Sequence, residues 1–253
     1  MRAPAALLLD FGGVLVETTK RPSWAAELAA DVHGRLVVAG CAVLTPQEVE
    51  LDIRAGVEAD RCWKDAMSRP YAPEEMTHRR FWGDFVAADW GPAARELVLA
   101  EATALCKRMG ELRQDRKIRP GIPALLTACA GRDVPVAVVS NSLSGAVHRD
   151  FVDAHGLRFA LQVYSDEVRV RKPNPEMIWI ATRALGVVPA DVWYVGDNYD
   201  RDVVCGARAG AGSTILMRSD STDKIPYEVR QRPAAVVDDA HGLLRLLEDT
   251  WTS

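Results

Sequence analysis

Four short polar segments, far apart in the chain, carry side chains that could do chemistry. In the first, Asp10 follows the apolar run 6–9 and precedes a glycine pair, Gly12 and Gly13. A carboxylate at the end of a buried strand, next to backbone that can be approached closely, can attack an electrophile or bind a cation. An aspartate that only caps a turn is the alternative interpretation.

The second segment is the polar end of the apolar run 134–140, where Ser140 is followed by Asn141 and Ser142. A hydroxyl and the first N–H groups of a helix at this position can hold an anion. An ordinary N-cap for a helix expected over residues 145–154 explains the same residues. Taken alone, this segment favours the ordinary N-cap.

The third segment contains Lys172, followed by Pro173 and Pro175 before a helix expected over residues 176–184. Proline restricts the backbone, so the ammonium group would be held in a fixed place. The alternative is a solvated surface pair of Arg171 and Lys172.

The fourth segment is VWYVGDNYDRD, residues 192–202, in which Asp197 ends an apolar run and Asp200 and Asp202 follow. Several carboxylates at the end of a strand repel one another unless a cation lies among them. Hard oxygen ligands of this kind suit Mg²⁺. Acidic residues favoured at a helix N-terminus would explain Asp200 or Asp202, but not Asp197.

Buried strands alternating with helices must position these segments. Short apolar runs at residues 6–10, 134–140, 161–165, 192–197 and 213–217 are bounded by turn residues and separated by helical patterns. Such runs are typical of a parallel sheet that is buried on both faces. The sequence therefore predicts an α/β fold with a doubly wound, Rossmann-like parallel sheet. The carboxyl ends of its strands meet at the edge where such sheets bind ligands.

A long stretch with a different residue pattern separates the first strand from the rest of this core. Thr45 to Glu48 fits a capping box with proline at the first helical position, and Pro73 and Pro92 each precede stretches with helical composition. We expect an inserted all-helical cap over residues 17–118, with residues 1–16 and 119–253 forming the α/β core. Such an insert can cover the carboxyl ends of the strands.

Composition excludes several classes of protein. The 253 residues are 48% hydrophobic and 26% charged, which is typical of a folded globular chain, and the net charge of −4 offers no basic excess for nucleic acid. Five scattered cysteines form no C-x-x-C pair and indicate free thiols in a reducing compartment. No run approaches the length of a membrane span. We therefore expect a cytoplasmic protein with neither a nucleic acid nor a membrane as partner.

Together, the four segments resemble the motifs of the haloacid dehalogenase superfamily, in which most members are phosphatases. Asp10, Ser140 with Asn141, Lys172 with Pro173, and Gly196-Asp197 with Asp202 occur in the family's order, each beside the expected strand or helix. The resemblance covers about residues 1–20 and 119–240. It implies a hydrolase that cleaves phosphoric monoesters and acts on a small phosphorylated substrate.

The resemblance also implies roles for single residues. Asp10 would be the nucleophile that forms an aspartyl-phosphate, while Ser140 and Lys172 would hold the phosphoryl oxygens and, with Asn141, bind the substrate. A Mg²⁺ cofactor would be coordinated by Asp10, Asp197 and the main-chain carbonyl of Gly12. Asp202 would bind this metal through water or orient the site.

One position departs from the family pattern. Most phosphatases of the family carry a second aspartate two residues after the nucleophile, where it protonates the leaving oxygen, and this chain has Gly12 there. A general acid contributes about 10²–10⁴-fold to the rate. Three alternatives stay open: a substrate with a good leaving group, a proton donor from the insert such as His33, His78 or Glu17, or a weak enzyme.

Two further functions compete with a phosphatase. A 2-haloacid dehalogenase uses the same nucleophile and also lacks the second aspartate, but it needs no Mg²⁺ and leaves the acidic loop around Asp197 unexplained. A non-catalytic regulatory or binding module could keep the fold, but the chain retains Asp10, Lys172 and Asp197, the groups that such a module would not need.

Overall fold

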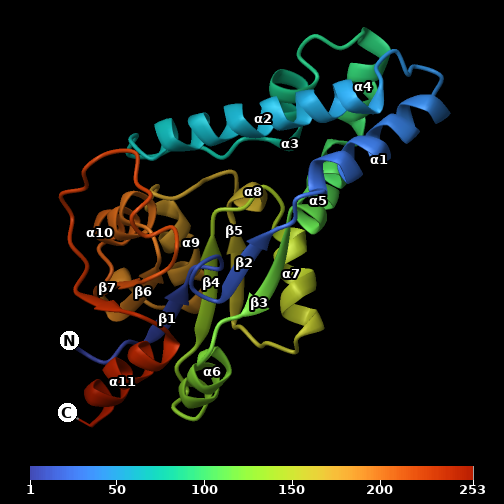
Figure 1. Cartoon of the computed structure of the whole chain (residues 1–253). Helices are drawn as coiled ribbons and strands as arrows, with labels where there is room; N and C mark the ends of the chain where they lie inside the picture. The colour runs from blue at the N-terminus through green and yellow to red at the C-terminus, as the bar shows by residue number, and fades with distance from the viewer. Residues whose placement is uncertain (253) are drawn as a thin grey trace. The chain divides into compact units, whose positions relative to one another are not determined.

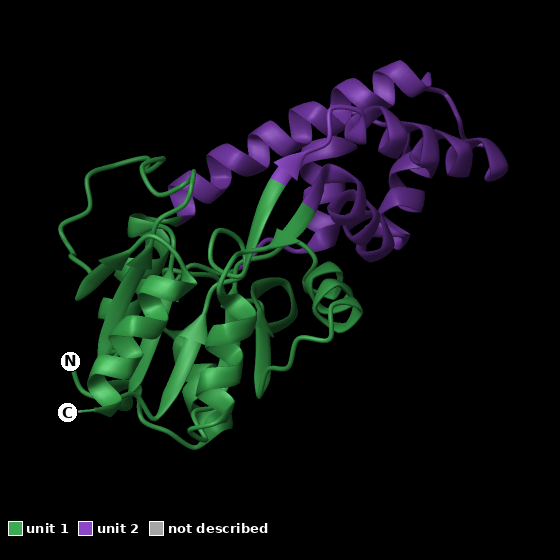
Figure 2. Ribbon diagram, turned by 60° about the horizontal axis from the view of Figure 1, so that its bottom comes forward, with its two compact units in different colours: residues 1–18, 68–74, 116–253 green, residues 19–67, 75–115 purple. Residues whose placement is uncertain are grey.

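The computed structural model of the chain describes residues 1–252, which form two compact units. Unit 1 comprises residues 1–18, 68–74 and 116–253, and unit 2 comprises residues 19–67 and 75–115 (Figure 2). The segment 68–74, which the sequence places inside the helical insert, clusters with unit 1.

Unit 1 is built on a six-stranded sheet in which all neighbouring strands are parallel (Figure 1). The strand order is β5-β4-β1-β6-β7-β8. The bounds are β1 Ala6–Leu9, β4 Val136–Ser140, β5 Leu161–Tyr164, β6 Val192–Gly196, β7 Ser213–Met217 and β8 Ala235–Val237. The predicted parallel α/β fold is confirmed, and β1 lies in the middle of the sheet, paired with both β4 and β6.

Helices cover both faces of this sheet because successive strand residues point to opposite sides. Leu7 and Leu9 of β1 belong to the hydrophobic cluster that includes the apolar faces of three helices, whereas Ala6 and Leu8 belong to the cluster on the other face. The first face is covered by α6 Ile122–Ala130, α7 Gly145–Ala154 and α11 Ala240–Trp251, and the second by α9 Glu176–Leu185 and α10 Val204–Ala209. Three short helical segments complete unit 1: α8 Ser165–Val168, η2 Pro189–Asp191 and η3 Tyr199–Val203.

Unit 2 is helical, as expected for most of the insert. Its elements are α1 Trp24–Val38, α2 Pro46–Met67, α3 His78–Arg80, η1 Phe81–Val86, α4 Pro92–Ala100 and α5 Ala102–Arg113. The predicted capping box is confirmed: Thr45 N donates to the Glu48 carboxylate at 2.7 Å, and Glu48 N donates to Thr45 Oγ1 at 3.3 Å. Pro92 begins α4, as predicted.

One expectation for this part of the chain is wrong, and another needs adjustment. The segment expected to be wholly helical begins and ends in strands, β2 Val16–Lys20 and β3 Gln114–Ile118, which form a two-stranded sheet. The helical stretch expected after Pro73 begins only at His78, because tertiary contacts hold the backbone at residues 73–74 extended: Glu74 forms a bridge with Val170, and the Pro73 carbonyl accepts a hydrogen bond from Arg171 N.

Large aromatic side chains form part of the core of unit 2. Trp82 is fully buried there, and Trp24 and Trp90 are nearly so. All five cysteines are free thiols. Every helix over residues 1–252 is too short or too polar to cross a lipid bilayer.

Candidate active site

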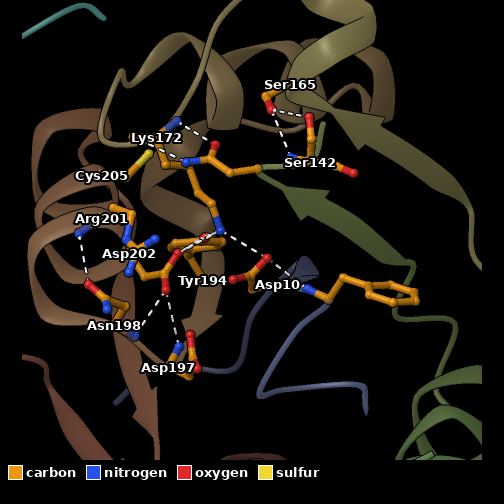
Figure 3. Close-up of polar contacts among 12 residues, drawn as sticks. Asp10, Ser142, Ser165, Lys172, Tyr194, Asp197, Asn198, Arg201, Asp202 and Cys205 are labelled. Carbon is orange, nitrogen blue, oxygen red and sulfur yellow. Dashed lines mark hydrogen bonds and ion pairs between the residues drawn. The ribbon is translucent and has the colours of Figure 1, made fainter. Parts of the chain in front are cut away.

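The site begins at Asp10, directly after β1 at the carboxyl edge of the sheet. Its Oδ1 atom accepts a hydrogen bond from Phe11 N at 2.7 Å and lies 2.9 Å from Lys172 Nζ (Figure 3). Among residues 1–252, nothing donates a hydrogen bond to Asp10 Oδ2. The protein therefore fixes one carboxylate oxygen of Asp10 and leaves the other without a donor.

Lys172 is held from both its main chain and its side chain. The Asn141 amide accepts from Lys172 N at 2.7 Å and donates to its carbonyl at 3.0 Å. The ammonium group contacts Asp202 Oδ1 at 2.6 Å and donates to the Tyr194 hydroxyl at 2.9 Å. With an exposed fraction of only 2%, Lys172 is a buried charge held by acidic partners, not the solvated surface residue of the alternative interpretation.

Asp202 forms the hub that connects the third and fourth segments. Its Oδ1 accepts from Lys172 and, at 2.7 Å, from the Tyr194 hydroxyl, while its Oδ2 accepts from the main-chain N–H groups of Asp197 and Asn198 at 3.1 and 3.0 Å. Four donors saturate a carboxylate of this kind. Asp202 therefore shapes the loop after β6 and fixes the Lys172 ammonium.

Hydroxyl groups from the segment after β7 surround Asp197. Ser219 donates to Asp197 Oδ2 at 2.6 Å, and Ser221 donates to the same oxygen. Thr222 donates to the Asp197 carbonyl at 2.8 Å. No donor among the described residues reaches Asp197 Oδ1.

Sequence reasoning missed these hydroxyl residues and Tyr194. Ser219 and Ser221 follow β7, whose carboxyl end lies at the same edge as those of β1 and β6, so the strand-end rule could have identified them. Tyr194 gave no such signal, because a tyrosine inside an apolar strand is usually a core residue.

Ser140 and the glycine pair after β1 lie at the same edge. Ser140 is the last residue of β4, the strand that pairs with β1. Its exposed fraction is only 2%. A Cβ atom added at Gly13 would lie 2.0 Å from Asp197 Oδ2, so glycine is required there for the close approach of the two loops. A Cβ added at Gly12 meets nothing within 4 Å.

Burial and mutual repulsion govern the charges of the site. Burial raises the pKa of Asp10 to about 6, against the opposing effect of Lys172. Burial and the charge of Asp202 also raise the pKa of Asp197. Burial acts against ionised Asp202 as well, but Lys172 and Tyr194 outweigh it and lower the pKa of that carboxyl. Burial favours neutral Lys172, yet Asp10 and Asp202 raise its pKa, so it stays charged.

The donor set fits a hard divalent cation. Asp10, Asp197 and Asp202 each place one carboxylate oxygen within 4.8 Å of the others. Burial is the main cause of the raised pKa values of Asp10 and Asp197, and the neighbouring carboxylates add to it. Oxygen ligands are those that Mg²⁺ prefers, and Asp197 Oδ1 has no donor among residues 1–252.

Fold and site thus define an α/β protein with a carboxylate and lysine centre at the carboxyl edge of a parallel sheet. The family model of the haloacid dehalogenase-like hydrolases matches residues 4–210 of this chain. The chain belongs to this family of hydrolases.

Similar proteins include phosphatases. The chain is 29% identical over 200 residues to the phosphoserine phosphatase of Thermus thermophilus, covering 67% of this chain and 80% of that protein. It is 34% identical over 87 residues to the glyceraldehyde 3-phosphate phosphatase of Methanopyrus kandleri, covering 34% of this chain and 37% of that protein. The match thus spans little more than a third of that second relative.

A solved structure with the same fold is the 2-haloacid dehalogenase of Pseudomonas syringae pv. Tomato DC3000. It is 16% identical, with a TM-score of 0.59, and the match covers 99% of this chain and 100% of that chain.

Proposed function

We propose that the protein is a Mg²⁺-dependent phosphatase that hydrolyses a small phosphorylated metabolite through an aspartyl-phosphate on Asp10. The observation that carries this proposal is the buried cluster in which Lys172 Nζ lies 2.9 Å from Asp10 and three carboxylates lie within 4.8 Å of one another. A carboxylate nucleophile repels a phosphate dianion, so such a reaction needs concentrated positive charge.

Asp10, Asp197 and the Gly12 carbonyl would hold the cation. When bound, Mg²⁺ supplies positive charge that offsets the charge on the phosphoryl oxygens. Asp10 Oδ2, which no protein donor occupies, would attack phosphorus as the bond to the leaving oxygen breaks, and water would then cleave the acyl phosphate. Lys172 and Ser140 would hold the phosphoryl oxygens.

One predicted role changes in this proposal, and a second is narrowed to one of its two alternatives. Both polar atoms of the Asn141 amide bond to the Lys172 main chain, so Asn141 acts as a positioning residue instead of contacting substrate. Because its four hydrogen bonds are all made within the protein, Asp202 orients Lys172 and the Asp197 loop and does not bind the metal directly.

Glycine at position 12 narrows the substrate class. We infer that the preferred substrate carries a leaving group that needs little protonation, such as an acyl or anomeric phosphate. The space around the Gly12 Cα admits a side chain, so Gly12→Asp is expected to raise turnover of alkyl phosphates and to change that of aryl phosphates much less. Gly12→Asn is the matched control, since it adds similar volume but no acid.

Phosphate release from acyl, sugar and aryl phosphates, with and without Mg²⁺, tests the proposal. We expect release that depends on Mg²⁺ and falls at least about 10³-fold in Asp10→Asn. Beryllofluoride with Mg²⁺ is expected to bind wild type but not Asp10→Asn.

Halide release from 2-haloacids without Mg²⁺ would instead establish the dehalogenase. Absence of both reactions, with no Mg²⁺ binding at millimolar concentration, would favour a binding module. The acidic cluster argues for the phosphatase, because displacement of halide from carbon has no phosphoryl charge to neutralise.

A further inference from the structure

Unit 2 contains a cavity of about 390 Å³ with a strongly cationic lining, formed wholly by residues of that unit. Five cationic side chains line it: Lys20, Arg21, Arg54, Arg61 and Arg113. Glu58 is the one carboxylate in the lining. None of these residues has a part in the chemistry proposed for Asp10.

Two of the five cationic side chains have no acidic partner. The other three pair with carboxylates that are close in sequence. These pairs are Arg21–Glu27, Arg54–Glu50 and Arg61–Glu58, at 3.0, 2.7 and 2.6 Å. Lys20 and Arg113 form no ion pair with any residue between 1 and 252. The cavity therefore keeps an excess of positive charge.

Two of these cationic side chains lie against the Trp24 ring, which forms one wall of the cavity. The guanidinium carbons of Arg54 and Arg113 lie 5.9 and 5.7 Å from the ring centroid, and Trp24 itself is only 9% exposed. An aromatic face attracts each guanidinium, but it does not remove the repulsion between them. An anion in the cavity would remove it.

Arg113 is half-buried and forms no ion pair among the described residues. Burial lowers the pKa of this arginine, and the charge of Asp60 opposes the shift only in part. Asp60 forms its own ion pair with Lys64 at 2.6 Å. A half-buried guanidinium without a carboxylate costs free energy of folding, a cost that a bound oxyanion would offset.

We propose that this cavity binds a small multivalent oxyanion, with Arg113 and Lys20 as its principal donors. The planar guanidinium fork matches both carboxylate and phosphate groups. A volume of about 390 Å³ suits a small ligand. This binding site is additional to the phosphatase centre and does not depend on it.

Calorimetric titration of the full-length protein in EDTA, with pyrophosphate and separately with citrate, tests the site. We expect the Kd of the bound anion to rise about tenfold in Arg113→Met and to recover in part in Arg113→Lys. Lys20→Met is expected to weaken binding in the same direction. Arg158→Met, which removes an exposed arginine of unit 1, controls for net charge and is expected to bind as wild type does.

Thermal unfolding separates this role from a structural one. Without anion, Arg113→Met is expected to melt no lower than wild type, because the substitution removes an uncompensated charge, and it should lose the rise in Tm that the anion produces. Binding of pyrophosphate but not citrate would identify a phosphoryl site, and the reverse a carboxylate site.

Equal affinity of wild type and Arg113→Met for both anions would overturn the proposal, as would a lack of binding by wild type to either anion up to about 10 mM. Since no readout uses phosphate release, failure of the phosphatase proposal leaves this test unaffected.

Discussion

Asp10 is a carboxylate whose proton affinity depends on the fold. Burial raises its pKa from the ordinary 3.8 to about 6. The folded state therefore binds the proton more tightly than the unfolded state, and between these two values the free energy of unfolding decreases as the pH rises. The loss is on the order of 2–3 kcal/mol once Asp10 is fully ionised.

We predict that Asp10→Asn stabilises the metal-free protein at pH 7.5, because asparagine removes the buried charge while keeping the shape. The gain should shrink by about 1 kcal/mol at pH 5, where wild-type Asp10 is mostly protonated. Urea unfolding in EDTA at both pH values measures this, with Asp153→Asn as the exposed control. Equal gains at the two pH values would show that charge is not the cause.

The two glycines after β1, Gly12 and Gly13, differ in how much space surrounds them. Gly13 has φ of +71°, and an added Cβ would lie 2.0 Å from Asp197 Oδ2, whereas an added Cβ at Gly12 meets nothing within 4 Å. Gly13→Ala should lower the free energy of unfolding by about 2 kcal/mol or more, and Gly12→Ala by less than about 1 kcal/mol. Denaturant unfolding of both variants decides the matter, and similar losses would contradict the steric argument.

At the scale of elements, Arg119 connects the segments that frame the site. Its guanidinium donates to the carbonyl of Gly13 after β1, to that of Arg218 at 3.0 Å after β7, and to that of Asp238 at 2.9 Å after β8. Ser219, which donates to Asp197, directly follows Arg218. One buried side chain thus holds three strand ends together.

Arg119→Met leaves three carbonyl groups without their donor, so we predict a loss of about 3 kcal/mol in the free energy of unfolding. The kcat for phosphate release should also fall, because Gly13 and Ser219 both adjoin Asp197. Arg218→Met is the control, since its side chain is 67% exposed and its ion pair with Asp238 contributes little. Urea unfolding and initial rates measure the two effects, and a change in Arg119→Met no larger than in Arg218→Met would rule out this role.

At the scale of the whole molecule, the chain passes between the two units four times, because residues 68–74 return to unit 1 in the middle of unit 2. Arg208 of α10 holds this segment. It donates to the carbonyls of Arg69, Pro70 and Tyr71, at 3.3, 2.7 and 3.1 Å. The Tyr227 hydroxyl adds a bond to the Ser68 carbonyl at 2.8 Å.

We predict that Arg208→Met speeds amide hydrogen exchange in residues 68–74 at least about tenfold and leaves exchange in β1 and β6 unchanged. The segment would lose several charge-assisted hydrogen bonds, whereas the sheet would lose none. Arg183→Met, at an exposed arginine of α9, is the control. Unaltered exchange in residues 68–74, followed by mass spectrometry, would show that other contacts hold the segment.

Much of the fold was predictable because hydrophobic periodicity is local. Five apolar runs indicated five strands of the main sheet, and β7 matches its run, 213–217, residue for residue. The strand β8 escaped notice because it has only three residues. In β2, four of the five residues are exposed, so that strand carries no buried pattern.

The sequence by itself determined that Asp10, Lys172 and Asp197 would follow strands or open a helix at one edge of a parallel sheet, because parallel strands end together. Only the tertiary structure decided the partners of these groups. Asp202 accepts hydrogen bonds from Lys172, Tyr194 and the main chain, and Ser219 and Ser221 donate to Asp197 from a separate loop. A hydrogen bond depends on distances of a few tenths of an ångström between residues far apart in the chain, and no local pattern encodes such distances.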